Sequence, residues 1–405
     1  MIARAMASAV LRRMRAGRLD LVEDGRTLAF GPEDAALGAT IQVNSPRFWR
    51  ALLRGSSGLA RSYAAGEWDC ADLVSLVRIG AREMPRLDRM RRPFVPLRNA
   101  FSRVPLNSRS GARKHVAAHY DLGNDLFELF LDRTMTYSCA VFDRAGSSLE
   151  EAQERKLDLV CRKLDLGPDD HVLEIGTGWG SFALHAAGRY GCRVTTTTIS
   201  AEQHALAVER VRAAGLSERV EVLAHDYREL NGRYDKLVSI EMIEAVGWQY
   251  FDEFFTRCGE LLRPGGSMLL QAIVVDDAAY EAEKASRTFI RELVFPSGCL
   301  PSLSVIDACV RRTTDMRAVE LDDITVHYPE TLSRWRRSFL AAAGRAEELG
   351  YDRAFRRVWE LYFAYCEGGF RERRIRTVQL ELAKPGDREP RPSGGRTLEA
   401  LGVRE

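Results

Sequence analysis

The sequence predicts an α/β fold organised around a mostly parallel β-sheet, and two observations carry this prediction. From His171 onward, short apolar runs alternate with amphipathic stretches of helical period, as in strands joined by crossover helices. The first apolar run ends in the glycine-rich segment LEIGTGWG, after which a helical pattern begins. Because open parallel sheets bind ligands at the carboxyl ends of their strands, this turn is the first candidate for a binding site.

The expected strands of this sheet are five apolar segments, with helices between them near 180–190, 201–214 and 248–263. The segments are HVLEIG, RVTTTTI, RVEVLAHD, KLVSIEMI and SMLLQAIVV. An insertion around 295–302 and a long helical region from about 329 to 372 follow, and a last strand is expected at 375–383.

The remaining segments suggest how the chain divides into domains. Residues 1–80 have the pattern of a small mixed domain, with a strand at 39–43 and helices at 46–66 and 73–83. The predicted domains are therefore this N-terminal domain (1–80), a basic linker (81–114), the sheet-bearing domain (115–385) and a tail (386–405). The tail is rich in proline, glycine and charge and is expected to be disordered.

Composition narrows the class of protein. The chain has 405 residues, a net charge of +2 and eight scattered cysteines without a C-x-x-C pair, so we expect reduced thiols and neither disulfides nor a metal site. No apolar window approaches the roughly 20 residues of a membrane-spanning helix. The apolar run near the N-terminus leads into arginines instead of a cleavage site, so no signal peptide is expected. These features predict a cytoplasmic protein that meets membranes only at their inner face.

The positive charge is concentrated in the linker, where ten Arg or Lys residues face only Glu83 and Asp88. One interpretation is a solvated spacer, and the other is a surface that attracts anionic phospholipid head groups. Nucleic acid is not the expected partner, because the segment carries apolar residues suited to lipid and no nucleic-acid-binding motif accompanies it.

The glycine-rich turn predicts a nucleotide cofactor. Gly176, Gly178 and Gly180 let the backbone approach a ligand closely, and the next helix offers free N–H groups. The spacing G-x-G-x-G is tighter than the dinucleotide fingerprint, and Glu174 precedes it by two residues. This pattern is typical of methyltransferases that use S-adenosylmethionine (AdoMet), although a dinucleotide site or a merely tight turn would also be compatible with it.

The rest of the cofactor site is expected after the following two strands. The candidates there are Thr198, Ser200, Gln203 and Asp226, the last placed to accept a hydrogen bond from an adenine amino group. Thr195 to Thr197 are better explained by the strand preference of threonine.

Several longer blocks make the chain similar to a known family. The blocks HYDLGNDLFELFLDRTMTYSCAVF, LEIGTGWG, TISAEQ, HDYREL, FPSGCLPS and HYPETLSRW, with NSPRFWRALLRGSSGLARSYAAGEWDC upstream, resemble the cyclopropane-fatty-acyl-phospholipid synthases. The resemblance spans about residues 40–383 and implies a class I AdoMet-methyltransferase fold, with a seven-stranded sheet and helical lid insertions. The N-terminal domain makes the chain similar to phospholipid-acting members of the family, so the implied partners are unsaturated phospholipid acyl chains.

The resemblance also implies a mechanism. The methyl group of AdoMet goes to a cis double bond, and a carbocation then loses a proton to a bound bicarbonate. By position, the implied catalytic set is Cys139, Glu244, Gln271, the Ile273 backbone and Tyr328. Cys139 would thus help to bind an anion, although a lone cysteine is more often buried filling. Tyr120, Tyr137 and Ser138 resemble the segment that closes over AdoMet, unless this segment is only an ordinary helix cap at Asn124 and Asp125.

Two departures from the family pattern bear on the product. Ala245 and Gln271 stand where the compared synthases have histidines, which puts bicarbonate binding and the exact product in doubt. Besides a cyclopropane, the product can be a methylene-branched chain that a separate reductase would saturate. Two further hypotheses are a non-catalytic AdoMet- or lipid-binding relative and a small-molecule methyltransferase. The sequence does not fix the oligomeric state, and a homodimer is compatible with it.

Overall fold

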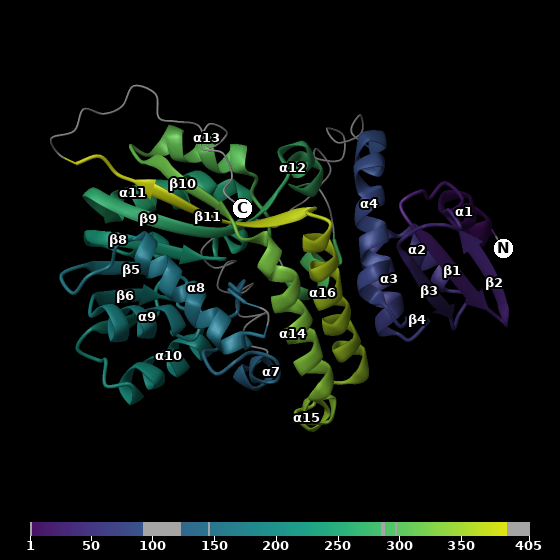
Figure 1. Cartoon of the computed structure of the whole chain (residues 1–405), viewed down its shortest axis with the longest axis horizontal. Coiled ribbons are helices and arrows are strands. Elements are labelled where there is room, and N and C mark those ends of the chain that lie inside the picture. The colour runs from purple at the N-terminus through teal and green to yellow at the C-terminus, as the bar shows by residue number, and fades with distance from the viewer. Residues whose placement is uncertain (1, 92–122, 145, 285–287, 296–297, 387–405) are drawn as a thin grey trace. The chain divides into compact units, whose positions relative to one another are not determined.

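A computed structural model describes residues 2–91, 123–144, 146–284, 288–295 and 298–386, without the side chains of 87–91. These residues form two compact units (Figure 1). Of the described residues, the first unit contains 2–91, 288–295 and 332–375, and the second contains 123–144, 146–284, 298–331 and 376–386. Within the described residues, no helix is long and apolar enough to cross a membrane.

The second unit is built on a seven-stranded sheet, as the sequence predicts. The strand order is β10-β11-β9-β8-β5-β6-β7, with parallel pairing from β9 to β7 and antiparallel pairing of β10 with β11. The strands are β5 (His171–Ile175), β6 (Arg193–Thr197), β7 (Val220–Leu223), β8 (Tyr234–Ile240), β9 (Leu262–Val275), β10 (Arg317–Asp323) and β11 (Ile375–Ala383).

Two hydrophobic cores cover the two faces of this sheet. Alternate residues of β5 point to opposite faces, so that Val172 joins one core and Leu173 joins the other. The Val172 core contains α8 (Leu149–Lys163), α9 (Ser181–His185) and α10 (Ala201–Ala213), and the Leu173 core contains α11 (Phe251–Leu261) and α13 (Leu303–Thr313). The central strands are therefore buried on both faces, as is typical of parallel sheets.

Short elements complete the second unit. They are α7 (Asn124–Glu128), α12 (Asp277–Lys284), the π-helix η2 (Ala186–Tyr190) and the 3-10 turns η3 (Tyr227–Glu229), η4 (Ile243–Ala245), η5 (Trp248–Tyr250) and η7 (Thr325–His327). A capping box at Ser148 and Glu151 fixes the start of α8.

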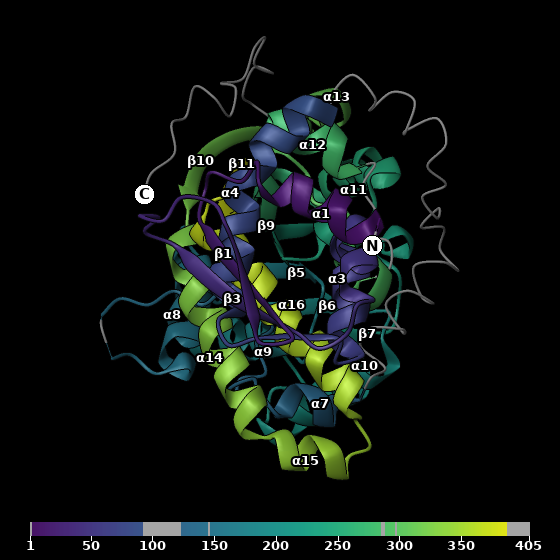
Figure 2. The same ribbon diagram turned by 90° about the vertical axis from the view of Figure 1, so that its right-hand side faces the viewer.

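The first unit combines a four-stranded sheet with helices from both ends of the chain. Its sheet has the order β2-β1-β3-β4, and Figure 2 shows β1 beside β3, with which it pairs in parallel. The strands are β1 (Arg18–Glu23), β2 (Arg26–Phe30), β3 (Gly38–Val43) and β4 (Trp68–Cys70). The helices are α1 (Ile2–Leu11), α2 (Phe48–Leu53), α3 (Gly55–Ala64), α4 (Leu73–Arg91), the π-helix η6 (Ile290–Val294), α14 (Tyr328–Ala341, from Leu332), α15 (Ala343–Glu348) and α16 (Arg353–Arg371).

The predicted strands and helices of both units are present, but the compact units cut across the predicted domains. Residues 332–375, which the sequence assigned to the domain 115–385, pack with the N-terminal elements. Helix α4 also continues to Arg91, into the segment predicted as a linker. The rest of that linker and residues 387–405 lie outside the described residues, so the linker and tail stay predictions.

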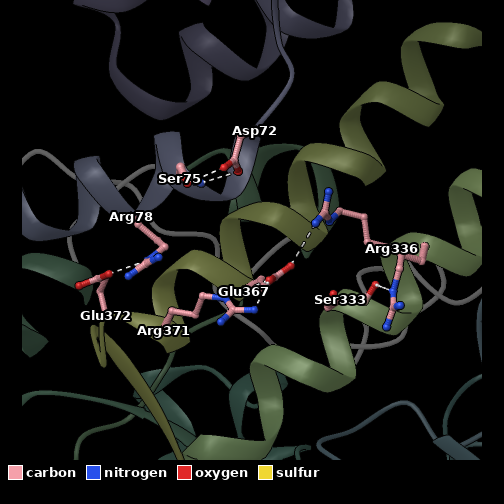
Figure 3. A network of polar contacts seen from close by, with 9 residues as sticks. Asp72, Ser75, Arg78, Ser333, Arg336, Glu367, Arg371 and Glu372 are labelled. Carbon is pink, nitrogen blue, oxygen red and sulfur yellow. Dashed lines mark hydrogen bonds and ion pairs between the residues drawn. The ribbon is translucent and has the colours of Figure 1, made fainter. Parts of the chain in front are cut away.

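Ion pairs join the long helices of the first unit (Figure 3). Glu367 on α16 is only 2% exposed and contacts Arg336 of α14 at 3.5 Å and Arg371 at 2.9 Å. Glu372, directly after α16, accepts hydrogen bonds from two arginines of α4, from Arg78 at 2.7 Å and from Arg82 at 2.6 Å. Carboxylates thus link α16 to helices that are far away in sequence.

Replacing Glu367 should destabilise this unit, because two arginines would lose a buried partner. We expect Glu367→Ala to lower the free energy of unfolding by about 2 kcal/mol or more. Urea denaturation followed by tryptophan fluorescence measures this. The control is Glu348→Ala, which removes an exposed pair with Arg345 and should change little. Equal effects of the two variants would contradict a structural role for Glu367.

Candidate functional site

The glycine turn adopts a backbone that only glycine tolerates easily. Gly176, Gly178 and Gly180 have φ values of 105°, 52° and 87°. A Cβ on Gly176 would lie 3.1 Å from the Met242 side chain, whereas a Cβ on Gly178 would meet no protein atom within 4 Å. The turn therefore leaves open space beside Gly178, directly before the N-terminus of α9.

A pocket opens at this turn, along the carboxyl ends of the central strands. Its lining includes eight of the predicted cofactor residues, namely Tyr137, Ser138, Glu174, Gly176, Gly178, Thr198, Gln203 and Asp226. Glu174 is buried and accepts from Thr196 Oγ1 at 2.6 Å. Burial raises the pKa of Glu174 to about 8.

Thr198, Ser200 and Gln203 form one hydrogen-bonded group at the start of α10. Thr198 Oγ1 donates to Gln203 Oε1 at 2.8 Å, and Ser200 Oγ accepts from the Gln203 backbone at 3.3 Å. Ser200 is thus the N-cap of α10, which leaves Thr198 and Gln203 to line the pocket.

Asp226 also lines the pocket, but its carboxylate has a protein partner. Arg228 donates to both carboxylate oxygens, from Nε at 2.9 Å and from Nη2 at 2.7 Å. The guanidinium of Arg228 lies 5.6 Å from the ring centroids of both Tyr227 and Tyr250. The adenine contact of Asp226 stays a prediction, and sequence reasoning missed Arg228.

A buried lysine supports the segment 137–139. Lys156 of α8 is fully buried, and its Nζ donates to Ser138 Oγ at 2.8 Å. Burial lowers the Lys156 pKa to about 8, although nearby acidic groups, Glu241 first among them, oppose this shift. The ring of Tyr137 packs edge-on against Phe127, at 5.3 Å between ring centroids. Tyr120 lies outside the described residues.

Cys139 is buried, and its backbone is the part that contacts an acidic group. Its Sγ lies 3.3 Å from the Ala140 carbonyl oxygen, and burial raises the pKa of the thiol well above its usual value. A neutral, buried thiol is a poor nucleophile. The Cys139 N–H instead donates to Glu241 Oε1 at 2.9 Å.

Glu241 is the point at which the predicted catalytic residues converge. Besides Cys139, Gln271 Nε2 donates to Glu241 Oε1 at 2.8 Å, and the Tyr328 hydroxyl donates to Oε2 at 2.5 Å. These three donors come from the segment before α8, from β9 and from the start of α14. Glu241 itself follows β8 and lines the same pocket as the glycine turn.

The carboxyl assigned to this set from the sequence, Glu244, lies in a different environment. Its Oε1 accepts from the Ile273 backbone N–H at 2.5 Å, and Oε2 is buried without a partner among the described residues. Burial raises the Glu244 pKa to about 8, and repulsion from Glu241 adds to the shift. Cys139, Gln271 and Tyr328 therefore donate to Glu241, while the Ile273 backbone donates to Glu244.

Sequence reasoning missed Glu241, although one signal was available. Glu241 and Glu244 both follow the apolar strand KLVSI, and the carboxyl end of a strand next to the glycine turn is where site residues are expected. The family pattern points to the second of these glutamates and not to Glu241. Gln379 was missed as well; its Nε2 donates to Gln271 Oε1 at 3.0 Å.

Comparison with known proteins places this site in a family. The family model described as mycolic acid cyclopropane synthetase matches residues 107–380. The chain is 40% identical to the tuberculostearic acid methyltransferase UfaA1 of Mycobacterium tuberculosis, over 82% of this chain and 80% of that protein. It is 36% identical to the cyclopropane-fatty-acyl-phospholipid synthase of Escherichia coli K12, over 85% and 88%.

A solved structure agrees with these matches. The mycolic acid cyclopropane synthase CmaA1, complexed with SAH and CTAB, superposes with a TM-score of 0.63 at 31% identity. The match covers 67% of this chain and 98% of that one. From these matches, the seven-stranded fold and the glycine turn, we conclude that the chain belongs to the mycolic acid cyclopropane synthetase family of AdoMet-dependent lipid methyltransferases.

Proposed function

We propose that this enzyme transfers the methyl group of AdoMet to the cis double bond of unsaturated acyl chains in membrane phospholipids. The observation that carries the proposal is a single pocket lined by both the glycine turn and Glu241. A methyl donor beside the turn and a proton acceptor therefore open onto the same space. The CTAB in the CmaA1 complex, a molecule with a long alkyl chain, supports an acyl substrate.

The pocket residues fit AdoMet. The open space beside Gly178 admits a ligand, and the N–H groups at the start of α9 suit its polar atoms. Glu174, Thr198, Gln203 and Asp226 would hold its polar parts. When bound, AdoMet supplies an electrophilic methyl group on a sulfonium.

The protein has two tasks in this reaction. An isolated alkene is a poor nucleophile, so the walls of the pocket must hold the double bond close to the methyl group and in line with it. Methyl transfer leaves a carbocation on the acyl chain, and a basic group must then remove a proton before water intercepts the cation. Tyr137, Trp179 and Met242 contribute apolar surface to the pocket.

We favour a cyclopropane as the product, in line with the cyclopropane synthases among the relatives. A second candidate is a methylene-branched chain, which a separate reductase would saturate. The relative named tuberculostearic acid methyltransferase favours this candidate. Both products start from the same methyl transfer, so the assigned pocket serves either.

Lipid analysis distinguishes these products. Expressed in a bacterial host that lacks such enzymes and is fed oleate, the protein should convert oleoyl chains into chains with one more carbon and two more hydrogens. Mass spectrometry of the phospholipids detects the gain, and proton NMR separates a cyclopropane from a methylene group. Unchanged oleoyl chains, with the protein folded and AdoMet bound, would contradict the proposed substrate.

The cofactor assignment is tested at Gly178. A valine there should abolish AdoMet binding, because its side chain would enter the open space of the pocket. The control is Gly215→Val, since Gly215 also has a positive φ, 69°, and no atoms near its Cβ position. Isothermal titration calorimetry that gives the two variants equal AdoMet affinity would remove Gly178 from the site.

We further propose that α1 meets the membrane surface from the cytoplasmic side. Ile2, Met6 and Val10 are spaced one turn apart and are 79%, 56% and 57% exposed, whereas Ala7 and Leu11 are buried beneath. The exposed Arg12, Arg13 and Arg15 follow this face directly. An apolar stripe beside positive charge suits an anionic lipid surface.

Vesicle binding tests this surface. The protein should sediment with vesicles of phosphatidylglycerol and phosphatidylcholine more than with phosphatidylcholine alone, and salt should weaken the difference. Met6→Glu should reduce binding to the anionic vesicles. Val208→Glu, on the exposed face of α10, is the control and should have no effect. Undiminished binding of Met6→Glu would mean that α1 does not contact lipid.

A further inference from the structure

The residues expected to hold bicarbonate do not fit a bound anion. The Cys139 N–H and the Tyr328 O–H each have a single hydrogen, and both donate to the Glu241 carboxylate. Gln271 Nε2 donates to the same carboxylate. A bicarbonate bound between these three residues would need the donors that Glu241 already uses. Its negative charge would also lie against the negative charge of the Glu241 carboxylate.

We infer that Glu241 itself supplies the carboxylate that removes the proton, so that this enzyme works without bicarbonate. The inference rests on the proposed methyl transfer and deepens it. Glu241 directly follows β8 and lines the pocket. Unlike bicarbonate, it therefore does not have to bind from solution before each reaction.

The backbone at Glu241 supports a functional role. Its φ is 49°, in the left-handed region that favours glycine. A side chain in that conformation strains the backbone. Such strain persists where the surroundings hold it in place, and it gathers at functional sites. Here the hydrogen bonds to both carboxylate oxygens, together with Glu241 N–H to Gln271 O at 2.8 Å, fix the residue.

Gln271 has a role in orienting Glu241, although its side chain carries no charge. Its Oε1 accepts from Gln379 Nε2, which turns its own Nε2 toward Glu241. An amide held this way always offers a hydrogen to the carboxylate, whereas a histidine does so only in one of its tautomers or when protonated. The glutamine that stands in place of the family's histidine therefore suits a carboxylate that belongs to the chain itself.

The proposed step balances as follows. The π electrons of the double bond form a bond to the methyl carbon, and the carbon–sulfur bond breaks with its electron pair on sulfur. Glu241 then takes a proton from the new methyl group, and the freed C–H electrons close the ring onto the cationic carbon. The proton leaves Glu241 for solvent before the next turnover.

The electrostatic surroundings suit this task. Burial raises the pKa of Glu241, and the three hydrogen bonds and Lys156 oppose the shift. A carboxylate with a raised pKa is a stronger base than an exposed one, and its donors keep it in place. The neighbouring Glu244 accepts a hydrogen bond from the Ile273 backbone instead.

Chemical rescue tests the inference. In buffer freed of carbon dioxide, the wild-type enzyme should keep its full rate. Glu241→Ala and Glu241→Gln should each lower kcat by about 100-fold or more, with AdoMet affinity by calorimetry little changed. Added bicarbonate or formate should restore activity to Glu241→Ala, which leaves room for an anion, and not to Glu241→Gln. Glu218→Gln, an exposed change in the same unit, is the matched control.

Binding provides a readout that is independent of activity. By NMR, 13C-labelled bicarbonate should bind Glu241→Ala and not the wild-type protein. A wild-type rate that requires bicarbonate, bicarbonate bound to the wild-type site, or a Glu241→Gln variant near the wild-type rate would each overturn the inference. If the wild-type enzyme methylates no lipid, the proposed function fails, while the NMR comparison still decides whether Glu241 fills the anion site.

Discussion

The burial of one carboxylate constrains the architecture of the site. A carboxylate removed from water needs hydrogen-bond donors, and those of Glu241 come from residues 139, 271 and 328. These residues are far apart in the sequence, and they come from a loop, a strand and the start of a helix that the fold brings together. The pairing of β8 with β9 sets Glu241 beside Gln271, and β11 adds Gln379 behind it. Sheet order therefore positions Glu241, Gln271 and Gln379, and the segments around residues 139 and 328 complete the site.

The charges in the pocket are balanced by one buried lysine and two buried glutamates. Glu174 and Glu241 both lie near the fully buried Lys156, whose positive charge favours their ionised forms. Without Lys156, two buried carboxylates would favour their protonated forms, and less Glu241 would be ionised and able to accept a proton. Lys156 also donates to Ser138, next to Cys139. One buried cation thus supports the carboxylates and the segment that donates to them.

Much of the fold follows from local signals in the sequence. The central strands are continuous apolar runs, and the glycine turn marks where β5 ends, so both were predictable. Strand β10 was not, because four of the seven residues of RAVELDD are charged and the strand lies at the edge of the sheet. The packing of residues 332–375 with the N-terminal elements depends on tertiary pairs such as Glu372 with Arg78, which no periodicity reveals.

The candidate site also combines residues that the sequence predicts with residues that only the structure reveals. Residues on the glycine turn were predictable because their role is local, whereas the partners of Cys139, Gln271 and Tyr328 depend on three-dimensional convergence. The family pattern points to Glu244, whereas the hydrogen bonds and the pocket lining single out Glu241. A carboxylate fixed by three donors cannot follow a cation along the acyl chain. Whether a ring closes or a methylene branch forms must then depend on how the walls of the pocket hold the chain against Glu241, since the base has one position.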